Sequence, residues 1–136
     1  MVDLALLLIR VWLGVTFVMH GSQKLFGWFG GAGINGTARY LEALGIRPGL
    51  FWAVLLGLGE FGGGISIALG LLTPLGALAI IIAMVVAIAA ETGRRGFWIQ
   101  SGGYEYNLMI IVVAVMLIVS GAGAYALDRT LGLLGP

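Results

Sequence analysis

The chain contains four long apolar stretches separated by two polar segments and one tight turn. They cover about residues 4–26, 50–72, 75–90 and 107–120. Because roughly 20 predominantly apolar residues cross the hydrocarbon core of a bilayer, each stretch predicts a membrane-spanning helix. Thr73 and Pro74 stand between the second and the third stretch, which predicts a hairpin through the membrane.

Two shorter helices are expected outside the spans. Residues 35–44 begin with Asn35 as a capping residue, continue with apolar residues at helical spacing and stop at a glycine, which predicts an amphipathic helix at the membrane interface. Residues 121–136 predict a surface tail with a short helix capped by Asp128. We therefore expect one all-α transmembrane domain over residues 1–136, a four-helix bundle with an interfacial helix between the first two spans.

Composition supports the membrane assignment. Of the 136 residues, 60% are hydrophobic and only 10% are charged, and the mean hydropathy is +1.09, far from the balance of a soluble domain. A net charge of +1 argues against a nucleic-acid partner, which needs a dense basic patch. The first span has no basic segment before it and no cleavage site after it, so we expect it to be retained rather than removed as a signal peptide.

The positive charges are unevenly distributed between the two sides of the predicted bundle. The loops joining spans one to two and three to four hold Lys24, Arg39, Arg47, Arg94 and Arg95 in or next to them. The other side offers chiefly Arg129. Because cytoplasmic loops are enriched in lysine and arginine, these two loops are expected in the cytoplasm and both termini outside it. The predicted location is the cell (inner) membrane.

Two ionisable residues, Arg10 and Glu60, fall at membrane depth. An unpaired charge there costs at least about 2.5–3.5 kcal/mol, so such residues pair or face the bundle interior. The simplest arrangement is an ion pair between the antiparallel first and second spans. The pair would fix the register of the helices, which is the favoured role for Arg10, while for Glu60 a functional role is equally open.

His20 and Lys24 are the only histidine and the only lysine, and their four-residue spacing places them on one side of a helix. One interpretation is a lysine that extends to water beside an interfacial histidine. The other is a ligand pocket that these two residues share with others from the second and fourth spans. Its candidate ligand-binding residues are His20, Lys24, Glu60, Tyr104, Glu105 and Asn107.

The residue types in this set suit a flat carbonyl ligand. A lysine and a neutral histidine donate hydrogen bonds to carbonyl oxygens, a buried carboxyl group relays a proton, and nearby aromatic rings enclose a ring. A quinone or another small aromatic molecule has these features. One histidine and no cysteine leave no haem, iron–sulfur or thiolate metal site to be expected, and no other metal site is predicted.

Four motifs in a fixed order make the chain resemble the DoxX family of small four-helix membrane proteins. They are His20-Gly21 with Lys24-Leu25-Phe26-Gly27 and Trp28-Phe29-Gly30-Gly31, Phe51-Trp52 leading to Glu60-Phe61-Gly62-Gly63-Gly64, Leu71-Leu72-Thr73-Pro74, and Gly102-Gly103-Tyr104-Glu105-Tyr106-Asn107. The resemblance implies a link to membrane oxidoreductase systems, including quinol oxidase and thiosulfate:quinone oxidoreductase subunits, and to oxidative-stress complexes. Many members have a histidine near the end of the third helix, where this chain has Ala89-Ala90-Glu91-Thr92-Gly93, so a two-histidine site is not expected.

Two functions from different classes follow. The first is a membrane oxidoreductase component that binds a quinone-like or small aromatic ligand near the cytoplasmic end of the bundle. The second is a non-catalytic scaffold or assembly subunit of a respiratory or oxidative-stress complex, whose glycine- and alanine-faced helices bind a partner. A homo-oligomer or a membrane or redox partner is expected in either case. Transport ranks last, because four short helices without a repeat make a poor alternating-access machine.

Overall fold

The computed structural model describes residues 1–134, and every regular element in this part of the chain is helical. The long helices are α1 (Val2–Phe26), α3 (Gly49–Leu69), α4 (Thr73–Ala90) and α5 (Glu105–Ser120). The shorter ones are α2 (Gly33–Ala43), α6 (Leu127–Leu131) and single 3-10 turns at Trp28–Gly30, Thr92–Arg95 and Ile99–Ser101. The predicted all-α class is confirmed.

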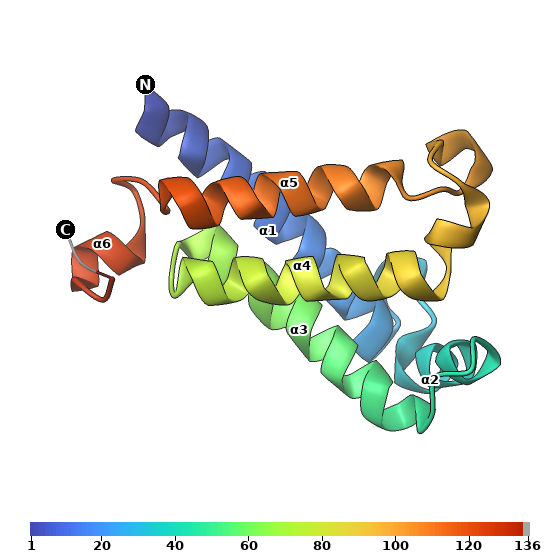
Figure 1. The fold of residues 1–136 in the computed structure, drawn as a ribbon. Helices are drawn as coiled ribbons and strands as arrows, with labels where there is room; N and C mark the ends of the chain where they lie inside the picture. Colours follow the sequence, from blue (N-terminus) through green and yellow to red (C-terminus); the bar gives the residue numbers. More distant parts are fainter. Residues whose placement is uncertain (135–136) are drawn as a thin grey trace.

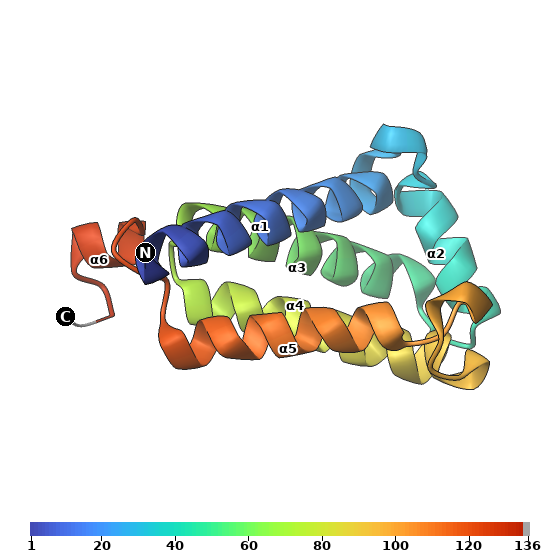
Figure 2. The same cartoon turned by 90° about the horizontal axis from the view of Figure 1, so that it is seen from above.

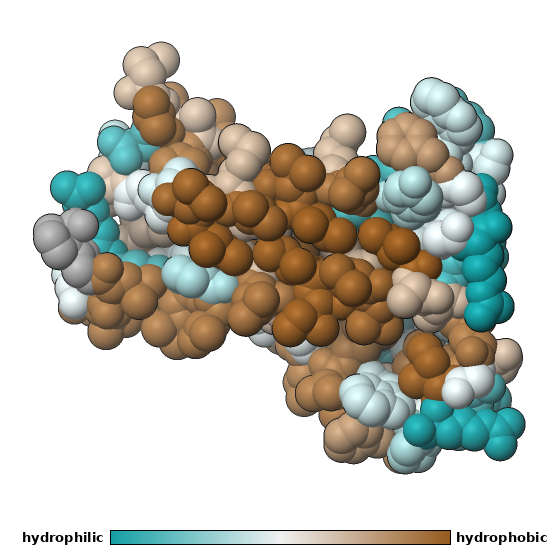
Figure 3. Space-filling view, viewed as in Figure 1, coloured by the Kyte–Doolittle hydropathy of each residue, from teal (hydrophilic) through white to brown (hydrophobic). Residues whose placement is uncertain are grey.

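Three of the long helices, α1, α3 and α4, are long and apolar enough to cross a membrane. The fourth, α5, is equally apolar in character but has 16 residues. It runs beside α4 over most of the length of that helix (Figure 2). Hydrophobic residues cover the middle of the molecule over α4 and α5, and hydrophilic residues gather towards the two ends (Figure 3). This distribution is that of a protein embedded in a bilayer.

The four long helices pack in sequence, α1 along α3, α3 along α4, and α4 along α5 (Figure 1). The start of α1 and the tail helix α6 lie at one end of the bundle, which we call the terminal end (Figures 1 and 2). At the opposite end, α2 and residues 91–104 form the connections, and we call this the loop end. Fully buried side chains fill the bundle interior, among them Phe17, Ile67, Ile80 and Leu117.

Glycines bring α1 and α3 into close contact. A Cβ atom added at Gly14 would lie 2.5 Å from the carbonyl oxygen of Gly64, and one added at Gly64 would lie 2.6 Å from that of Gly14. At Gly21 it would lie 2.6 Å from the backbone nitrogen of Phe61. The two backbones therefore approach to a separation that only glycine permits, as small residues allow in membrane helix pairs.

Arg10 is fully buried at the terminal end of the bundle, where it binds backbone oxygens rather than Glu60. Its guanidinium donates to the carbonyl oxygens of Ile67 at 3.2 Å, Ala68 at 3.3 Å and Tyr125 at 2.7 Å. The predicted Arg10–Glu60 ion pair is therefore wrong. The antiparallel register places Arg10 opposite the last turn of α3, where carbonyls lack helical partners, about two turns away from Glu60.

Asp128 also has a different role from the predicted one. Its carboxylate is buried and accepts hydrogen bonds from the backbone N–H groups of Leu72 at 2.6 Å and Thr73 at 3.0 Å. It therefore caps the start of α4, whereas α6 begins after Ala126 without a side-chain cap. The tail is fastened to the bundle rather than lying loosely on its surface; residues 135–136 of the predicted tail lie outside the described residues.

Several predicted helix boundaries differ from the observed ones by one to three residues. The second span was expected to continue to residue 72, but α3 ends at Leu69 because Gly70 adopts a left-handed conformation with φ of +67°. The interfacial helix begins at Gly33, so Asn35 lies inside α2 and does not cap it. A left-handed glycine thus ends α3, and α2 begins without the expected side-chain cap.

Candidate functional site

A cavity of about 290 Å³ lies at the loop end, between the four long helices and α2. Most of its wall is apolar, but polar side chains reach it from α1, α2, α3 and α5 and from the residues after α4. Those that matter for its chemistry are His20, Lys24, Tyr40, Glu60, Tyr106 and Asn107. The structure thus brings together four of the six predicted ligand-binding residues, His20, Lys24, Glu60 and Asn107.

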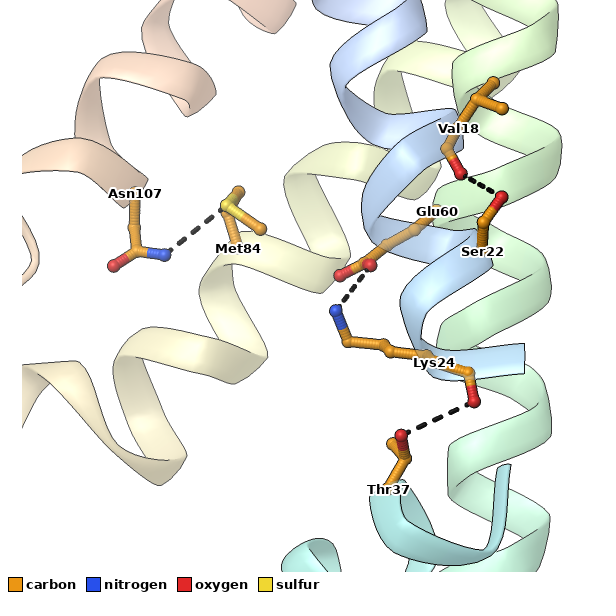
Figure 4. A network of polar contacts seen from close by, with 7 residues as sticks. All are labelled: Val18, Ser22, Lys24, Thr37, Glu60, Met84 and Asn107. Atoms are coloured by element: carbon orange, nitrogen blue, oxygen red, sulfur yellow. Dashed lines mark hydrogen bonds and ion pairs between the residues drawn. The ribbon is translucent and has the colours of Figure 1, made fainter. Parts of the chain in front are cut away.

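An ion pair between Lys24 and Glu60 forms the polar centre of this cavity. Lys24 Nζ lies 2.7 Å from Glu60 Oε2, and their side chains are 25% and 4% exposed (Figure 4). Lys24 occupies the last turn of α1 and Glu60 the middle of α3, and the antiparallel packing of these helices places the two opposite each other. Lys24, the only lysine of the chain, is therefore the charge partner of the buried Glu60 carboxylate.

His20 lies one helical turn before Lys24 and lines the same cavity. Its imidazole packs beside the buried ring of Phe17, with the ring centroids 5.7 Å apart and the planes tilted by 45°. The side chain is half-buried. Packing against Phe17 orients the imidazole, so that a ring nitrogen can serve as a hydrogen-bond donor or acceptor towards a ligand.

Asn107 enters the cavity from α5. Its Nδ2 donates to the sulfur of Met84 on α4 at 3.4 Å (Figure 4). Asn107 begins the buried stripe of α5 that continues with Ile110, Ala114 and Leu117, so it is fixed on the inner face of that helix. A thioether is a weak acceptor, and the amide therefore has hydrogen-bonding capacity to offer a bound ligand.

Tyr104 and Glu105 do not reach the cavity. Tyr104 precedes the first turn of α5, and its ring packs edge-on against Phe97 with centroids 5.6 Å apart. Glu105 accepts a hydrogen bond from the backbone N–H of Ile99 at 2.9 Å. Both side chains hold the loop between α4 and α5. Tyr104 precedes the helix, and Glu105, two positions before Asn107, points to a different side of α5.

A contact between α2 and the end of α4 borders the cavity at the loop end. The Tyr40 hydroxyl donates to Glu91, and Glu91 also pairs with Arg95 at 2.8 Å. Burial, together with this hydrogen bond, raises the pKa of Tyr40 to about 12. A second contact, from Thr37 Oγ1 to the carbonyl oxygen of Lys24 at 3.5 Å, holds α2 against the end of α1 (Figure 4).

Sequence reasoning missed Tyr40, Glu91 and Tyr106 as cavity residues. Tyr106 belongs to the fourth family motif and directly precedes Asn107, the first residue of the buried stripe of α5, and this position is the sequence signal for it. Tyr40 and Glu91 belong to segments 51 residues apart that meet only in the folded chain. No local pattern signals that contact.

The arrangement combines hydrogen-bond donors, a buried carboxylate and aromatic rings around a space that suits one small ring. Lys24 can donate to a carbonyl oxygen, and Glu60 can hold or release a proton next to it. Within residues 1–134, no group of three or more histidine, aspartate or glutamate side chains could hold a metal ion. The chemistry available from these side chains is hydrogen bonding and proton transfer.

These features define a helical integral membrane protein with a polar cavity at one end of its bundle. The DoxX family model matches residues 5–93, and the chain belongs to the DoxX family. It is 34% identical to the inner membrane protein YqjF of Escherichia coli over 131 residues, which cover 95% of this chain and 93% of that protein. Because 95% of this chain is covered, the match to YqjF includes α5, which lies beyond the family match.

Two other relatives are more distant. The membrane protein Rv3486 of Mycobacterium tuberculosis is 32% identical over 90% of this chain and 78% of its own length. The Bacillus subtilis protein named "Putative oxidoreductase CatD" is 25% identical over 93% of this chain and 86% of its own length. No solved structure matches the chain.

Proposed function

We propose that this DoxX-family protein is the membrane component of an oxidoreductase system and binds a quinone-like or other small aromatic ligand in the loop-end cavity. The observation that carries the proposal is the Lys24–Glu60 ion pair, which lines that cavity together with His20. A buried carboxylate beside a hydrogen-bond donor is suited to a ligand whose oxygen takes up a proton. The name of the Bacillus subtilis relative supports the oxidoreductase class.

In this proposal, Lys24 binds a carbonyl oxygen of the ligand and Glu60 exchanges a proton with it. Full reduction of a quinone to a quinol takes two electrons and two protons. A redox partner protein supplies the electrons, since the chain has no cysteine for thiol or iron–sulfur chemistry. Glu60 passes one of the two protons to the oxygen that Lys24 binds, His20 passes the other to the second carbonyl oxygen, and Asn107 orients the ring.

The proposed orientation places the loop end in the cytoplasm and both termini outside it, in the cell (inner) membrane. The basis is the set of lysine and arginine residues at the loop end. Because the chain has no cysteine, Arg94→Cys and Arg129→Cys each provide a single thiol. In intact cells, a membrane-impermeant maleimide should label only Arg129→Cys. Labelling of Arg94→Cys alone would reverse the orientation.

The ligand proposal is tested on the full chain in lipid nanodiscs. A short-chain benzoquinone should bind to the wild-type protein and raise its melting temperature, and His20→Ala and Glu60→Gln should each weaken binding about 10-fold or more, the range for loss of a hydrogen bond to a charged or buried group. Glu105→Gln is the matched control, because its carboxylate bonds only the loop. It should bind as the wild type does.

The ligand proposal is contradicted if the wild type does not bind the benzoquinone. It is also contradicted if the wild type, His20→Ala, Glu60→Gln and Glu105→Gln all bind it equally. Co-purification of a stable protein partner without any bound quinone would then favour the scaffold function, because it is the outcome that a non-catalytic assembly subunit predicts. Binding of quinone together with a partner would agree with the proposed role as a component of a larger redox system.

A further inference from the structure

We infer that the site takes a ligand with a long apolar tail, and that the tail lies in a second cavity between α3 and α4. This inference rests on the proposed function and adds the chemical class of the ligand to it: a lipid-soluble quinone rather than a bare ring. The polar head would occupy the loop-end cavity, and the tail would extend towards the hydrocarbon of the bilayer.

The second cavity, which we call the tail groove, is an apolar hollow of about 280 Å³ on the outer side of α3 and α4. Trp52, Leu55, Gly59, Ala79 and Ile82 line it. The indole N–H is the polar side-chain group among them, and it donates to the carbonyl oxygen of Arg47 at 3.3 Å. The groove therefore offers a ligand only hydrocarbon and aromatic surface.

The tail groove adjoins the polar cavity. The residues lining both are Leu41, Ile46, Leu56, Ala83 and Val86. One layer of apolar side chains thus separates a cavity that holds an ion pair from a groove that has no charged side chain. Leu41 is buried, but Ile46 and Leu56 are only half-buried, so their side chains can change rotamer. Ala83 has only a methyl group to displace. A single amphiphilic molecule can span the two cavities across this layer.

The size of the polar cavity also favours a tailed ligand. Ligand pockets commonly measure roughly 300–1,000 Å³, and the loop-end cavity, at about 290 Å³, is at the lower end. It can enclose a ring but has no room for a ring and a long chain. Exposed Leu55 and Ile82 lie along the tail groove on the side of the molecule that faces lipid, so a chain placed there continues into the bilayer.

Gly59 leaves the floor of the tail groove open. A Cβ atom added there meets no heavy atom within 4 Å, and the residue lies inside α3. Gly59→Leu should therefore fill the groove without a clash in the protein. Gly62, about one turn later on α3, is equally open, but it lines a neighbouring hollow and not the tail groove. Gly62→Leu is the matched control for helix propensity, size and hydrophobicity.

The experiment compares two probes in nanodiscs of one lipid composition: 2,3-dimethoxy-5-methyl-1,4-benzoquinone, and the same ring with a decyl chain. Affinities are measured for wild type, Gly59→Leu and Gly62→Leu, and each variant is compared with wild type for the same probe, so that membrane partitioning cancels. Gly59→Leu should bind the decyl probe about 10-fold or more weakly, the range for overpacking a filled site. It should bind the bare ring normally, and Gly62→Leu should bind both normally.

Other outcomes contradict the inference in distinguishable ways. If Gly59→Leu binds the decyl probe as tightly as wild type, the groove holds ordinary lipid chains and the inference is wrong, while the proposed function stands. If Gly59→Leu loses both probes equally, the substitution distorts the head site and the tail assignment is also wrong. If wild type binds neither probe, the proposed function fails and the inference fails with it.

Discussion

Lys24 Nζ lies 2.7 Å from Glu60 Oε2, and the two ends of this ion pair differ sharply in burial. The Glu60 side chain is 4% exposed, whereas Lys24 keeps 25% of its surface exposed. Lys24 can therefore turn towards the loop end and regain water if its partner is removed, but Glu60 on the middle of α3 has no such path. The pair is asymmetric, and its two members should respond differently to substitution.

Removal of the lysine should be the more damaging change. Lys24→Met leaves a buried carboxylate without its partner and should lower the free energy of unfolding by about 2–3 kcal/mol, less than for a fully buried pair because Lys24 is partly exposed. Glu60→Gln should lower it less. In the double variant the loss should be smaller than in Lys24→Met alone. Denaturation in detergent micelles measures all three, and additive losses would contradict the coupling.

Substitution of Arg10 should loosen the tail as well as the bundle. Arg10→Met leaves the carbonyl groups of Ile67, Ala68 and Tyr125 without this donor, and we expect a loss of about 2–4 kcal/mol. Because Tyr125 lies in the tail, limited proteolysis should cut the chain faster after residue 120. Leu8→Met, on the exposed side of α1, is the control, and equal cleavage of both variants would argue against the role of Arg10.

The close packing of α1 and α3 predicts a strong difference between two glycines of α3. In Gly64→Ala the new Cβ would lie 2.6 Å from the carbonyl oxygen of Gly14, so the helices must separate, with a loss of about 1–3 kcal/mol. Gly62→Ala places a methyl group in open space and should be neutral or slightly stabilising. Melting temperatures in one detergent give the comparison, and similar values for the two variants would refute it.

The phenol of Tyr40 should lose its proton at a higher pH than that of an ordinary tyrosine. Its pKa is raised to about 12, first by burial and then by its hydrogen bond to Glu91. A raised folded-state pKa means that the contribution to stability is fully present below pH about 10, the unfolded value, and is lost as the pH rises towards 12. The phenolate absorbance of wild type minus that of Tyr40→Phe should have its midpoint near 12, whereas a midpoint near 10 would show that the phenol is free in solution.

Much of the fold could be predicted from the chain because its pattern is local. The apolar runs mark all four long helices, since a bilayer requires each crossing segment to satisfy its own backbone hydrogen bonds. The predicted ends of the helices were less accurate than their predicted positions along the chain. Gly70 stops α3 three residues before the predicted end, and only the backbone conformation reveals which of several glycines does so.

The candidate site was predicted in part for the same reason. His20 and Lys24 share a helix face by spacing alone, and Asn107 belongs to the apolar stripe of α5. The partners of charged residues were not predictable in this way. Two cationic side chains on α1, Arg10 and Lys24, could each have met Glu60, and helix phase places both on similar sides of the helix.

The sequence by itself determined that this is a helical membrane protein and which helix faces are polar, because burial of a backbone in lipid and the period of the helix are local constraints. Tertiary structure alone decided that Lys24 pairs with Glu60, that Arg10 holds the tail, and that Tyr40 meets Glu91. For the contacts of Lys24 and Arg10 with α3, the physical reason is the register of α1 against α3, which is fixed where the backbones of Gly14 and Gly64 meet. The Tyr40–Glu91 contact depends instead on how α2 packs against the end of α4.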